Sequence, residues 1–509
     1  MTGVRAAAEA GAAAAYTPVE LAFTGPAEPI PASRVPFVLD VRLGGRRLRV
    51  PGFWDGGDRY LARFLPDAAG EWSWSTRSDA AELDGHAGSV TVAAAVGHGP
   101  VRVAERFHFA HADGTAYRPV GATVYNWLHQ PDELVAATIE AIADAGFTKL
   151  RFLVFPQAGD YVEHEPELLP FERTASGWDV DRPVVAFFRR LDAAVRVLGE
   201  RGIQADVLIL NAYDGGHFGL DELTEEQDAG YLRYLVARLS AFPNVWWSLC
   251  NEFDILDRPR GRWDRLGALL AEIDPHDHLR SIHNWIELFD HNRPWITHAS
   301  IQNGHVTTDF GRAGLYRDVY DKPVVLDEIN YEGDIPERWG HLDAHELVHQ
   351  FWVATVSGCY ASHGESFARP GGSLHIVEGG ALTGRSPLRL AFLRQVLDDL
   401  VIPGIDPIDK WDDPEYVGGV ARRQYLRYLG RSAPESWRFR LPQATNVGER
   451  LQPGDAFTVD VIDTWNMTVT AIERPFVLDD VRRNEAFAPD RLALPAGEAI
   501  ALRITRTTR

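Results

Sequence analysis

The chain has 509 residues, of which 45% are hydrophobic, and a formal net charge of −21 at pH 7. This length predicts two or three domains, each with enough apolar residues for its own core. The acidic charge argues against a nucleic acid or an anionic membrane as partner, because both bind basic faces, but it is compatible with a neutral carbohydrate. The sequence contains no apolar run of transmembrane length.

Residues 1–15 are rich in alanine and lack the apolar core of a signal peptide, so they predict a disordered leader and a cytoplasmic protein. Residues 16–97 contain short period-two segments broken by Gly, Pro and Asp, which predict an N-terminal β-sandwich. Trp72 and Trp74 alternate with serine in one segment, which favours core packing over a sugar-binding platform. Residues 98–117 are predicted to be a connector.

Residues 118–403 alternate between strand-like and helix-like segments, which predicts a (β/α)8 TIM barrel. The eight predicted strands are Gly121–Trp127, Thr148–Phe155, Gln204–Asn211, Asn244–Asp254, Leu279–Trp285, Trp295–Gly304, Lys322–Gly333 and Gly358–Phe367. The predicted helices are Pro131–Ala145, Asp181–Arg201, Glu225–Ala241, Trp263–Ile273, Asp343–Val356 and Pro387–Leu400. Short strands return afterwards, so residues 404–509 predict a C-terminal antiparallel β-domain.

Two of the predicted barrel strands end in carboxylates. The fourth is a continuous apolar run that ends in Asn251 and Glu252, and the seventh ends in Asp327 and Glu328. The carboxyl ends of the strands in such a barrel meet on one face, where active sites lie. Two carboxyl groups facing one cleft are the minimal equipment for glycoside hydrolysis. The structural alternative is that both glutamates form salt bridges at the rim.

At these positions the chain resembles the retaining glycosidases of the large (β/α)8 clan, in which an acid/base Glu preceded by Asn follows strand four and a nucleophile Glu follows strand seven. The resemblance implies that Glu252 is the acid/base, that Glu328 is the nucleophile and that no cofactor is needed. Residues 54–79 resemble a β-sandwich that precedes bacterial glycoside hydrolases, and residues 106–127 resemble the start of the barrel in the apiosidase-like group. The latter resemblance favours an unusual furanoside or pentoside as substrate.

Other residues are candidates for the sugar pocket. In the clan an Arg on strand two commonly holds the nucleophile, which would be Arg151 here, although a structural ion pair is an equal alternative. His298 is a candidate to contact the nucleophile or a substrate hydroxyl, with a core histidine as the alternative. Further candidates at strand ends are Asn126, Trp127, Asn211, Asn251, Trp285, Asn303, His363 and Glu365. The clan often places a Trp at the end of strand eight, where this chain has none. Rival carboxylates are Asp254, Asp327 and Glu332.

A metal centre is the main competing chemistry. Four histidines cluster in sequence, namely His276, His278, His283 and His291. Zinc hydrolases on this barrel typically carry an HxH motif on the first strand, but the first predicted strand has no histidine. His276 and His278 follow the helix-ending pair Asp274–Pro275, which favours a solvated loop. The sequence therefore predicts no metal site.

Cys250 and Cys359 lie in predicted buried strands and are expected to be reduced thiols. The predicted function is that of a glycoside hydrolase with a carbohydrate substrate, exo-acting on small glycosides or oligosaccharides, and the prediction leaves homo-oligomerisation open. Two alternatives are a metal-dependent hydrolase on the same barrel and a non-catalytic carbohydrate-binding protein. Stoichiometric zinc or manganese would favour the first, and hydrolysis unaffected by Glu252→Gln or Glu328→Gln would remove the assignment of these two glutamates.

Overall fold

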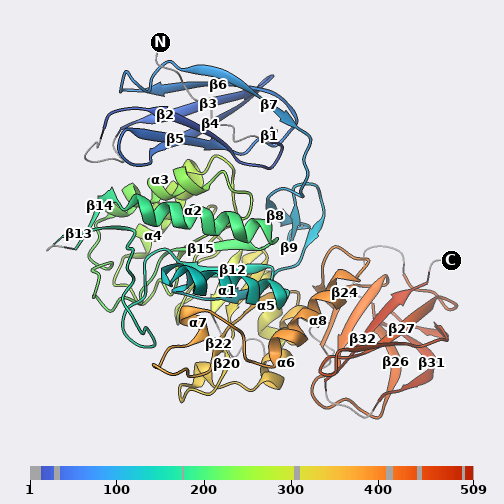
Figure 1. Ribbon diagram of the computed structural model, residues 1–509. Coiled ribbons are helices and arrows are strands. Elements are labelled where there is room, and N and C mark those ends of the chain that lie inside the picture. Colours follow the sequence, from blue (N-terminus) through green and yellow to red (C-terminus); the bar gives the residue numbers. More distant parts are fainter. Residues whose placement is uncertain are drawn as a thin grey trace.

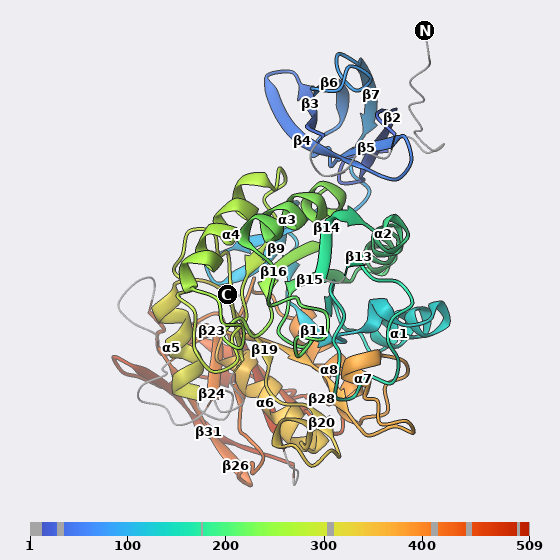
Figure 2. The same ribbon diagram turned by 90° about the vertical axis from the view of Figure 1, so that its left-hand side faces the viewer.

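The computed structural model describes residues 13–27, 35–174, 177–302, 310–408, 416–443, 450–495 and 499–507. Three parts follow one another along the chain: a β-rich N-terminal domain, a central barrel ringed by helices and a C-terminal β-domain (Figure 1). Figure 2 shows the barrel between the other two parts. The fold class predicted from the sequence is confirmed. None of the described helices is long and apolar enough to cross a membrane.

The seven strands of the N-terminal domain pair in the order β1-β7-β6-β3-β4-β5-β2. They are β1 (Ala13–Ala14), β2 (Val19–Thr24), β3 (Phe37–Leu43), β4 (Arg46–Trp54), β5 (Arg59–Phe64), β6 (Gly70–Ser78) and β7 (Ala87–Ala93). Trp72 and Trp74 are buried in its core, as predicted. Strand β1 lies within the predicted leader, yet it pairs with β7, so this end of the leader is part of the sheet. Residues 1–12 of the predicted leader lie outside the described residues.

The predicted connector is a small antiparallel sheet that closes the N-terminal end of the barrel. Its strands are β8 (Val101–Ala104), β9 (His108–His111) and β10 (Ala116–Tyr117). The rings of Phe109 and Tyr117 pack against Trp246, with centroids 5.0 and 6.0 Å away. Trp246 is near the start of the fourth barrel strand. The connector therefore seals the end of the barrel opposite to the carboxyl ends of the strands.

Eight parallel strands form the barrel at the predicted positions. In chain order they are β11 (Val120–Thr123), β12 (Lys149–Leu153), β15 (Gln204–Leu210), β16 (Val245–Cys250), β17 (Arg280–Ser281), β18 (Ala299–Gln302), β19 (Val324–Glu328) and β21 (Tyr360–His363). A parallel bridge between His283 and Ser300 joins the fifth strand to the sixth and completes the ring. Cys250 and Cys359 are free and buried, as predicted.

The helices surround this barrel. They are α1 (Asp132–Asp144), α2 (Val185–Glu200), α3 (Glu225–Leu239), α4 (Arg260–Ile273), α5 (Phe310–Tyr320), α6 (Ala344–Val356), the short α7 (His375–Glu378) and α8 (Ser386–Asp398), with 3-10 turns η2 (Trp127–His129) and η4 (Arg338–Gly340). The sequence did not predict α5. The predicted helix from Asp181 instead begins at Val185, because β13 (Phe171–Thr174) and β14 (Gly177–Pro183) form a hairpin before it. Two short strands, β20 (Glu332–Gly333) and β22 (Glu365–Ser366), pair above the barrel.

The C-terminal domain has two antiparallel sheets, in the orders β23-β24-β25-β32-β27-β28 and β26-β31-β30, and β29 pairs with β27. Their strands are β23 (Asp406–Pro407), β24 (Tyr416–Val420), β25 (Gln424–Tyr428), β26 (Ser436–Pro442), β27 (Ala456–Asp463), β28 (Thr468–Ala471), β29 (Phe476–Val477), β30 (Asp480–Val481), β31 (Glu485–Ala493) and β32 (Ile500–Arg506). The domain packs beside α6 and α8 (Figure 1).

Both β-domains are joined to the barrel by buried contacts. At the N-terminal interface, Arg238 of α3 forms ion pairs with Asp55 at 3.0 Å and with Asp192 at 2.6 Å. At the C-terminal interface, Tyr428 stacks on Trp352 of α6, with ring centroids 5.6 Å apart. One hydrophobic cluster runs from the N-terminal domain through the barrel into the C-terminal domain.

A buried ionic network lies inside the barrel. Lys149 is fully buried, with its amine 2.5 Å from a carboxylate oxygen of Asp206 and 2.6 Å from one of Asp327. Replacing Lys149 with Met would leave Arg151 as the cation facing these two buried carboxylates. Its Nε lies 3.9 Å from an oxygen of Asp206 and 3.6 Å from one of Asp327. We expect the free energy of unfolding to fall by about 3–5 kcal/mol, because breaking a buried pair leaves uncompensated charge. Urea denaturation measures this loss.

The matched control is Arg46→Met, which breaks an exposed ion pair with Asp67. Exposed pairs contribute at most about 1 kcal/mol. Equal, small losses in the two variants would contradict a structural role for the ionic network.

Candidate active site

The carboxylate of Glu328 is surrounded by donors at the carboxyl end of the barrel. Its Oε1 accepts hydrogen bonds from the hydroxyl of Tyr125 at 2.6 Å and from the amide of Asn251 at 3.2 Å. Nη1 of Arg151 lies 3.4 Å and Nε2 of His283 lies 3.3 Å from the same oxygen. Burial alone would raise the pKa of Glu328, but the histidine, the arginine and the tyrosine lower it to about 2. Glu328 is therefore ionised at neutral pH.

Glu252 has the opposite electrostatic environment. Burial, followed by the negative charge of Glu328, raises the pKa of Glu252 to about 8, against the opposing effect of hydrogen bonds with Tyr213 and Gln302. Glu252 is therefore protonated at neutral pH. It lies two residues beyond the end of β16 in a left-handed backbone conformation, with φ at 51°. Such strain in a non-glycine residue clusters at functional sites.

Asn251 links the two carboxyl groups. Its oxygen accepts a hydrogen bond of 2.5 Å from Arg151. Its nitrogen donates to the hydroxyl of Tyr213 at 2.5 Å as well as to Glu328. Because Tyr213 also bonds to Glu252, two side chains connect the protonated glutamate to the ionised one. This pairing of an acid with a carboxylate fits the chemistry of glycoside hydrolysis.

Comparison with known proteins agrees with this geometry. The profile of the family described as "Apiosidase-like, catalytic domain" matches residues 104–366, which is more than half of the chain. The chain belongs to this family of glycoside hydrolases. The flanking domains of this apiosidase-like protein match two domains of unknown function, DUF5060 over residues 12–79 and DUF5605 over residues 411–505.

Solved structures support the family assignment. A protein from Bacteroides vulgatus described as a glycoside hydrolase has a TM-score of 0.93 and 32% sequence identity, with 97% of this chain and 99% of that chain covered. A family 5 glycoside hydrolase from the same organism has a TM-score of 0.59 and 15% identity, covering 80% and 93% of the two chains, and shows the fold alone. No curated protein matches the chain.

The apiosidase-like barrel brings together Glu252, Glu328, Asn251 and Arg151 from the set predicted by sequence. His298 does not join them, and the expectation that it contacts the nucleophile is wrong. It precedes β18 at the closed end of the barrel, where its ring packs against Trp246 at 5.2 Å and Phe109 at 5.8 Å.

Three further predicted residues have structural partners instead of lining the site. Trp127 is fully buried and packs on Phe152, because η2 turns it back into the core. Asn126 exchanges hydrogen bonds with the backbone of Gln157 at 2.7 and 3.1 Å. Asn211 donates to the carbonyl of Phe155 and accepts from the backbone N–H of Tyr213 at 2.8 Å. Asn211 therefore positions a site residue without facing the pocket itself.

The remaining predictions divide into three groups. Trp285 is 48% exposed at the rim, and its backbone N–H donates to Asp254, which also accepts from the next two N–H groups. Asn303 lies outside the described residues. His363 and Glu365 are buried beside Glu332 and are not exposed to a sugar, so they do not form the floor of a sugar subsite.

The rival carboxylates Asp254 and Asp327 are held by structural hydrogen bonds. Asp254 anchors the loop that follows the fifth barrel strand, as described above. Asp327 binds Lys149, Ser300 and Ser362 inside the barrel at 2.6–2.8 Å. Each of these side chains has a defined structural partner, which leaves Glu252 and Glu328 as the carboxyl pair of opposite protonation at this face.

The clustered histidines do not form the solvated loop predicted from the sequence. His278, His283 and His291 are fully buried, and His276 accepts a hydrogen bond from the backbone of Leu65 at 3.2 Å. They are distributed along a segment that runs from the closed end of the barrel to the site and back, where His291 lies beside Tyr320 and Lys322 ahead of β19. His283 reaches Glu328, while His278 bonds to Asp274.

Sequence reasoning missed five residues that surround the pair: Tyr125, Tyr213, His283, Gln302 and Tyr331. The rings of Tyr125 and Tyr213 pack with centroids 5.3 Å apart. A signal was present, because Tyr125 immediately precedes the Asn126–Trp127 pair that the sequence favoured. Strand β11 ends at Thr123, four residues before the predicted end at Trp127, and the residue that reaches Glu328 is Tyr125.

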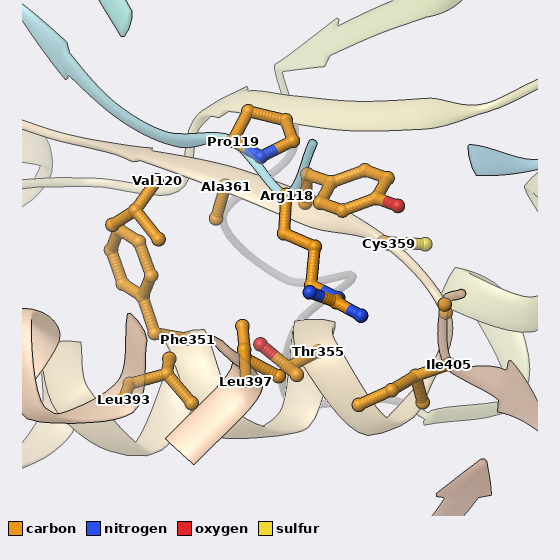
Figure 3. A pocket seen from close by; sticks show the side chains of 13 residues that line it. Arg118, Pro119, Val120, Phe351, Thr355, Cys359, Ala361, Leu393, Leu397 and Ile405 are labelled. Atoms are coloured by element: carbon orange, nitrogen blue, oxygen red, sulfur yellow. The ribbon is translucent and has the colours of Figure 1, made fainter. Parts of the chain in front are cut away.

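Hollows lie over the carboxyl face of the barrel. One of about 430 Å³ is formed by the loops after β12 and β15, between Gln157–Pro166 and Asp214–Phe218. A second of about 380 Å³ is lined by residues that include Tyr161 and Glu337. The cavity in Figure 3, lined by Arg118 and its neighbours, lies at the start of β11 and β21 and has room for about one water molecule (about 20 Å³). The first two hollows have the volume of a sugar and the third does not, but neither Glu252 nor Glu328 lines any of them.

Proposed function

We propose that this protein hydrolyses an O-glycosidic bond with net retention of configuration. In the first step, a carboxylate oxygen of Glu328 attacks the anomeric carbon, the bond to the aglycone breaks, and Glu252 transfers its proton to the departing oxygen. In the second step, Glu252 takes a proton from water as the water oxygen attacks the anomeric carbon and the bond to Glu328 breaks. The observation that carries the roles of acid and carboxylate is the opposite pKa shift of the two glutamates, and retention rests on the resemblance to the retaining clan.

The surroundings of Glu328 suit a nucleophile. Tyr125, Asn251 and Arg151 hold one oxygen of its carboxylate, which fixes the direction of attack. Arg151 is itself fixed by Thr123 at 3.2 Å and by Asn251. A carboxylate held by neighbouring donors needs no reorganisation as charge moves in the transition state.

The substrate we propose is a small glycoside or oligosaccharide, cleaved from its end. Glu252 and Glu328 are only 7% and 6% exposed, which favours an enclosed pocket for one terminal sugar over an open groove. The half-exposed Trp285 offers an aromatic face at the rim for the next group. The name of the apiosidase-like family supports an unusual furanoside or pentoside as the terminal sugar.

Methanolysis tests retention directly. Aryl furanosides and pyranosides of pentoses are first screened for release of the phenol, and the best substrate is then turned over in buffer with added methanol. Capture of the glycosyl intermediate by methanol gives a methyl glycoside, whose anomer does not interconvert in water and can be assigned by NMR. We expect the anomer of the substrate, and the opposite anomer would overturn the double-displacement mechanism.

We expect a basic limb in the pH profile of kcat/KM. Glu252 must be protonated to act as an acid, so activity should fall as the pH rises through about 8, the value to which its pKa is raised. Glu328 must be ionised, and its pKa of about 2 means that it causes no loss of activity above that pH. Initial rates of aryl glycoside hydrolysis between pH 4 and pH 10 measure the limb. A fall in kcat/KM with rising pH that has an apparent pKa near 4, instead of near 8, would contradict the role of Glu252.

A further inference from the structure

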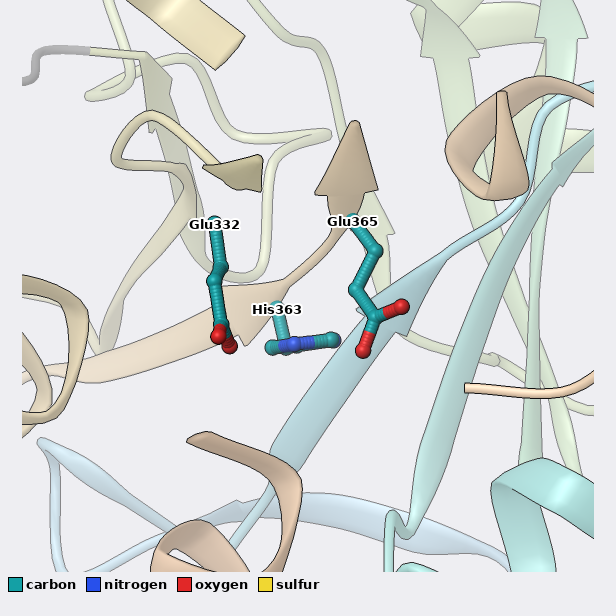
Figure 4. A group of neighbouring side chains, drawn as sticks. All are labelled: Glu332, His363 and Glu365. Carbon is teal, nitrogen blue, oxygen red and sulfur yellow. The ribbon is translucent and has the colours of Figure 1, made fainter. Parts of the chain in front are cut away.

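A second cluster of acidic and imidazole side chains lies above the seventh and eighth barrel strands. Glu332 of β20 and Glu365 of β22 are register partners in a two-stranded sheet, and His363 ends the preceding strand β21. One ligand atom from each of the three residues lies within 4.8 Å of the other two. Figure 4 shows the ring of His363 between the two carboxylates.

The described hydrogen-bond partners of the two carboxylates are all neutral. Each accepts hydrogen bonds of 2.8–3.0 Å from backbone N–H groups of residues 383–386, and the hydroxyls of Thr383 and Ser386 add to these. Among the described residues, the cations that act on their charges are Arg369 for Glu365 and Arg389 for Glu332, and both donate their hydrogen bonds to backbone carbonyls instead. A Cβ atom at Gly384 would lie 2.5 Å from an oxygen of Glu332 and 2.6 Å from one of Glu365, so both carboxylates flank this glycine. Two adjacent buried anions are costly unless a cation or a proton lies between them.

His363 is the independent observation that points to a ligand. Its side chain is 1% exposed, and neither ring nitrogen has a hydrogen-bond partner among the described residues. One face of the ring stacks on Phe147, with centroids 4.9 Å apart. A buried polar group without a partner costs about 1–3 kcal/mol. An imidazole held by stacking beside two carboxylates is the arrangement of a metal ligand.

We propose that Glu332, His363 and Glu365 bind one divalent transition-metal ion. One imidazole nitrogen and two carboxylate oxygens suit zinc, whereas calcium and magnesium favour oxygen ligands alone. Donors of a tetrahedral zinc site with bonds of about 2.0–2.2 Å lie roughly 3.5 Å apart. The three donors therefore need only small side-chain movements to close around the ion.

The proposed ion is structural. All three ligands are at most 3% exposed, so no substrate or bulk water reaches the space between them, whereas a catalytic zinc keeps an open position. It would join the loops after strands seven and eight to the start of α8, whose first N–H groups hold the carboxylates. Tyr331, next to Glu332, packs beside Trp339 near the reacting pair, so the ion would stabilise one wall of the site.

Metal analysis of the full chain tests this. The protein is treated with a chelator, incubated with zinc, passed through a desalting column and analysed by plasma mass spectrometry. We expect about one zinc per chain, together with a Tm several degrees above that of the chelated protein. X-ray absorption at the zinc edge should show one imidazole with carboxylate oxygens, a readout that requires no variant.

The matched variants are His363→Phe and His291→Phe. His291 is also fully buried, has two ring nitrogens without a described hydrogen-bond partner and packs on Tyr320, but it lies outside this cluster. We expect His363→Phe to lose the zinc and the Tm increase, and His291→Phe to keep both. Less than about 0.1 zinc per wild-type chain, or equal zinc in both variants, would overturn the proposal. If the wild-type chain binds almost no zinc, a proton shared among Glu332, His363 and Glu365 takes the place of the ion.

Discussion

Replacing Glu328 with Gln is expected to lower kcat by about 10⁴-fold or more on every glycoside that the wild-type protein hydrolyses, because the first covalent bond cannot form without the carboxylate. Glutamine keeps an oxygen that can accept from Tyr125 and Arg151, so the fold should persist. Steady-state rates, with circular dichroism as the check on folding, measure the effect. The loss should be the same for good and poor leaving groups.

The control for this variant is Glu200→Gln, which removes an exposed carboxylate at the end of α2 and should leave kcat within about threefold. A slow fluorinated substrate adds a second measurement. It should increase the mass of the intact wild-type chain by one glycosyl group, and peptide mapping should place that group on Glu328. A label on another residue would refute the assignment.

Replacing Glu252 with Gly should produce a loss that depends on the leaving group. For a poor leaving group, such as an alkyl alcohol, kcat/KM should fall by about 10²–10⁴-fold, the usual contribution of a general acid. For a dinitrophenyl glycoside, which departs without protonation, the loss in kcat/KM should be small. Glycine suits this position because φ is 51° there, so the substitution relieves backbone strain and opens space near the anomeric carbon.

Added azide distinguishes an acid/base role of Glu252 from a structural role. Azide needs no general base, so it should restore turnover of the dinitrophenyl substrate by Glu252→Gly and give a glycosyl azide of retained configuration. The basic limb near pH 8 should disappear in the same variant. Asp254→Asn is the matched control, because Asp254 anchors the neighbouring loop through three backbone N–H groups. If azide rescues that variant as well, Glu252 is not the acid/base.

The sequence predicted the barrel and the candidate pair Glu252 and Glu328 from two physical features, while the roles of the two glutamates came from the family resemblance. Parallel strands buried on both faces are continuous apolar runs, and a carboxylate directly after such a run stands out. Glu328 ends β19, and Glu252 follows β16 by two residues. Arg151 was recognisable for the same reason, as a charge in the middle of a buried strand.

The rest of the site depends on backbone detail that spacing does not encode. Whether Tyr125 or Trp127 faces the pocket depends on where the 3-10 turn begins. His298 and His283 both lie near barrel strands, but His298 precedes β18 and so lies at the closed end, while His283 follows β17 and reaches the open end. The Glu332–His363–Glu365 cluster was not predicted because its members come from three short strands, β20, β21 and β22, and are held by the segment that leads into α8.

The hydrophobic cluster that spans all three parts of the chain has a consequence for any attempt to shorten the protein. Phe53 and Leu61 at one interface and Tyr428 at the other are members of the same cluster as the barrel residues, so deleting either β-domain would expose apolar surface on the remainder. Neither β-domain is an independent unit joined to the barrel only by a flexible linker. Calorimetry should record one endotherm for the whole chain, and limited proteolysis should release no stable isolated barrel.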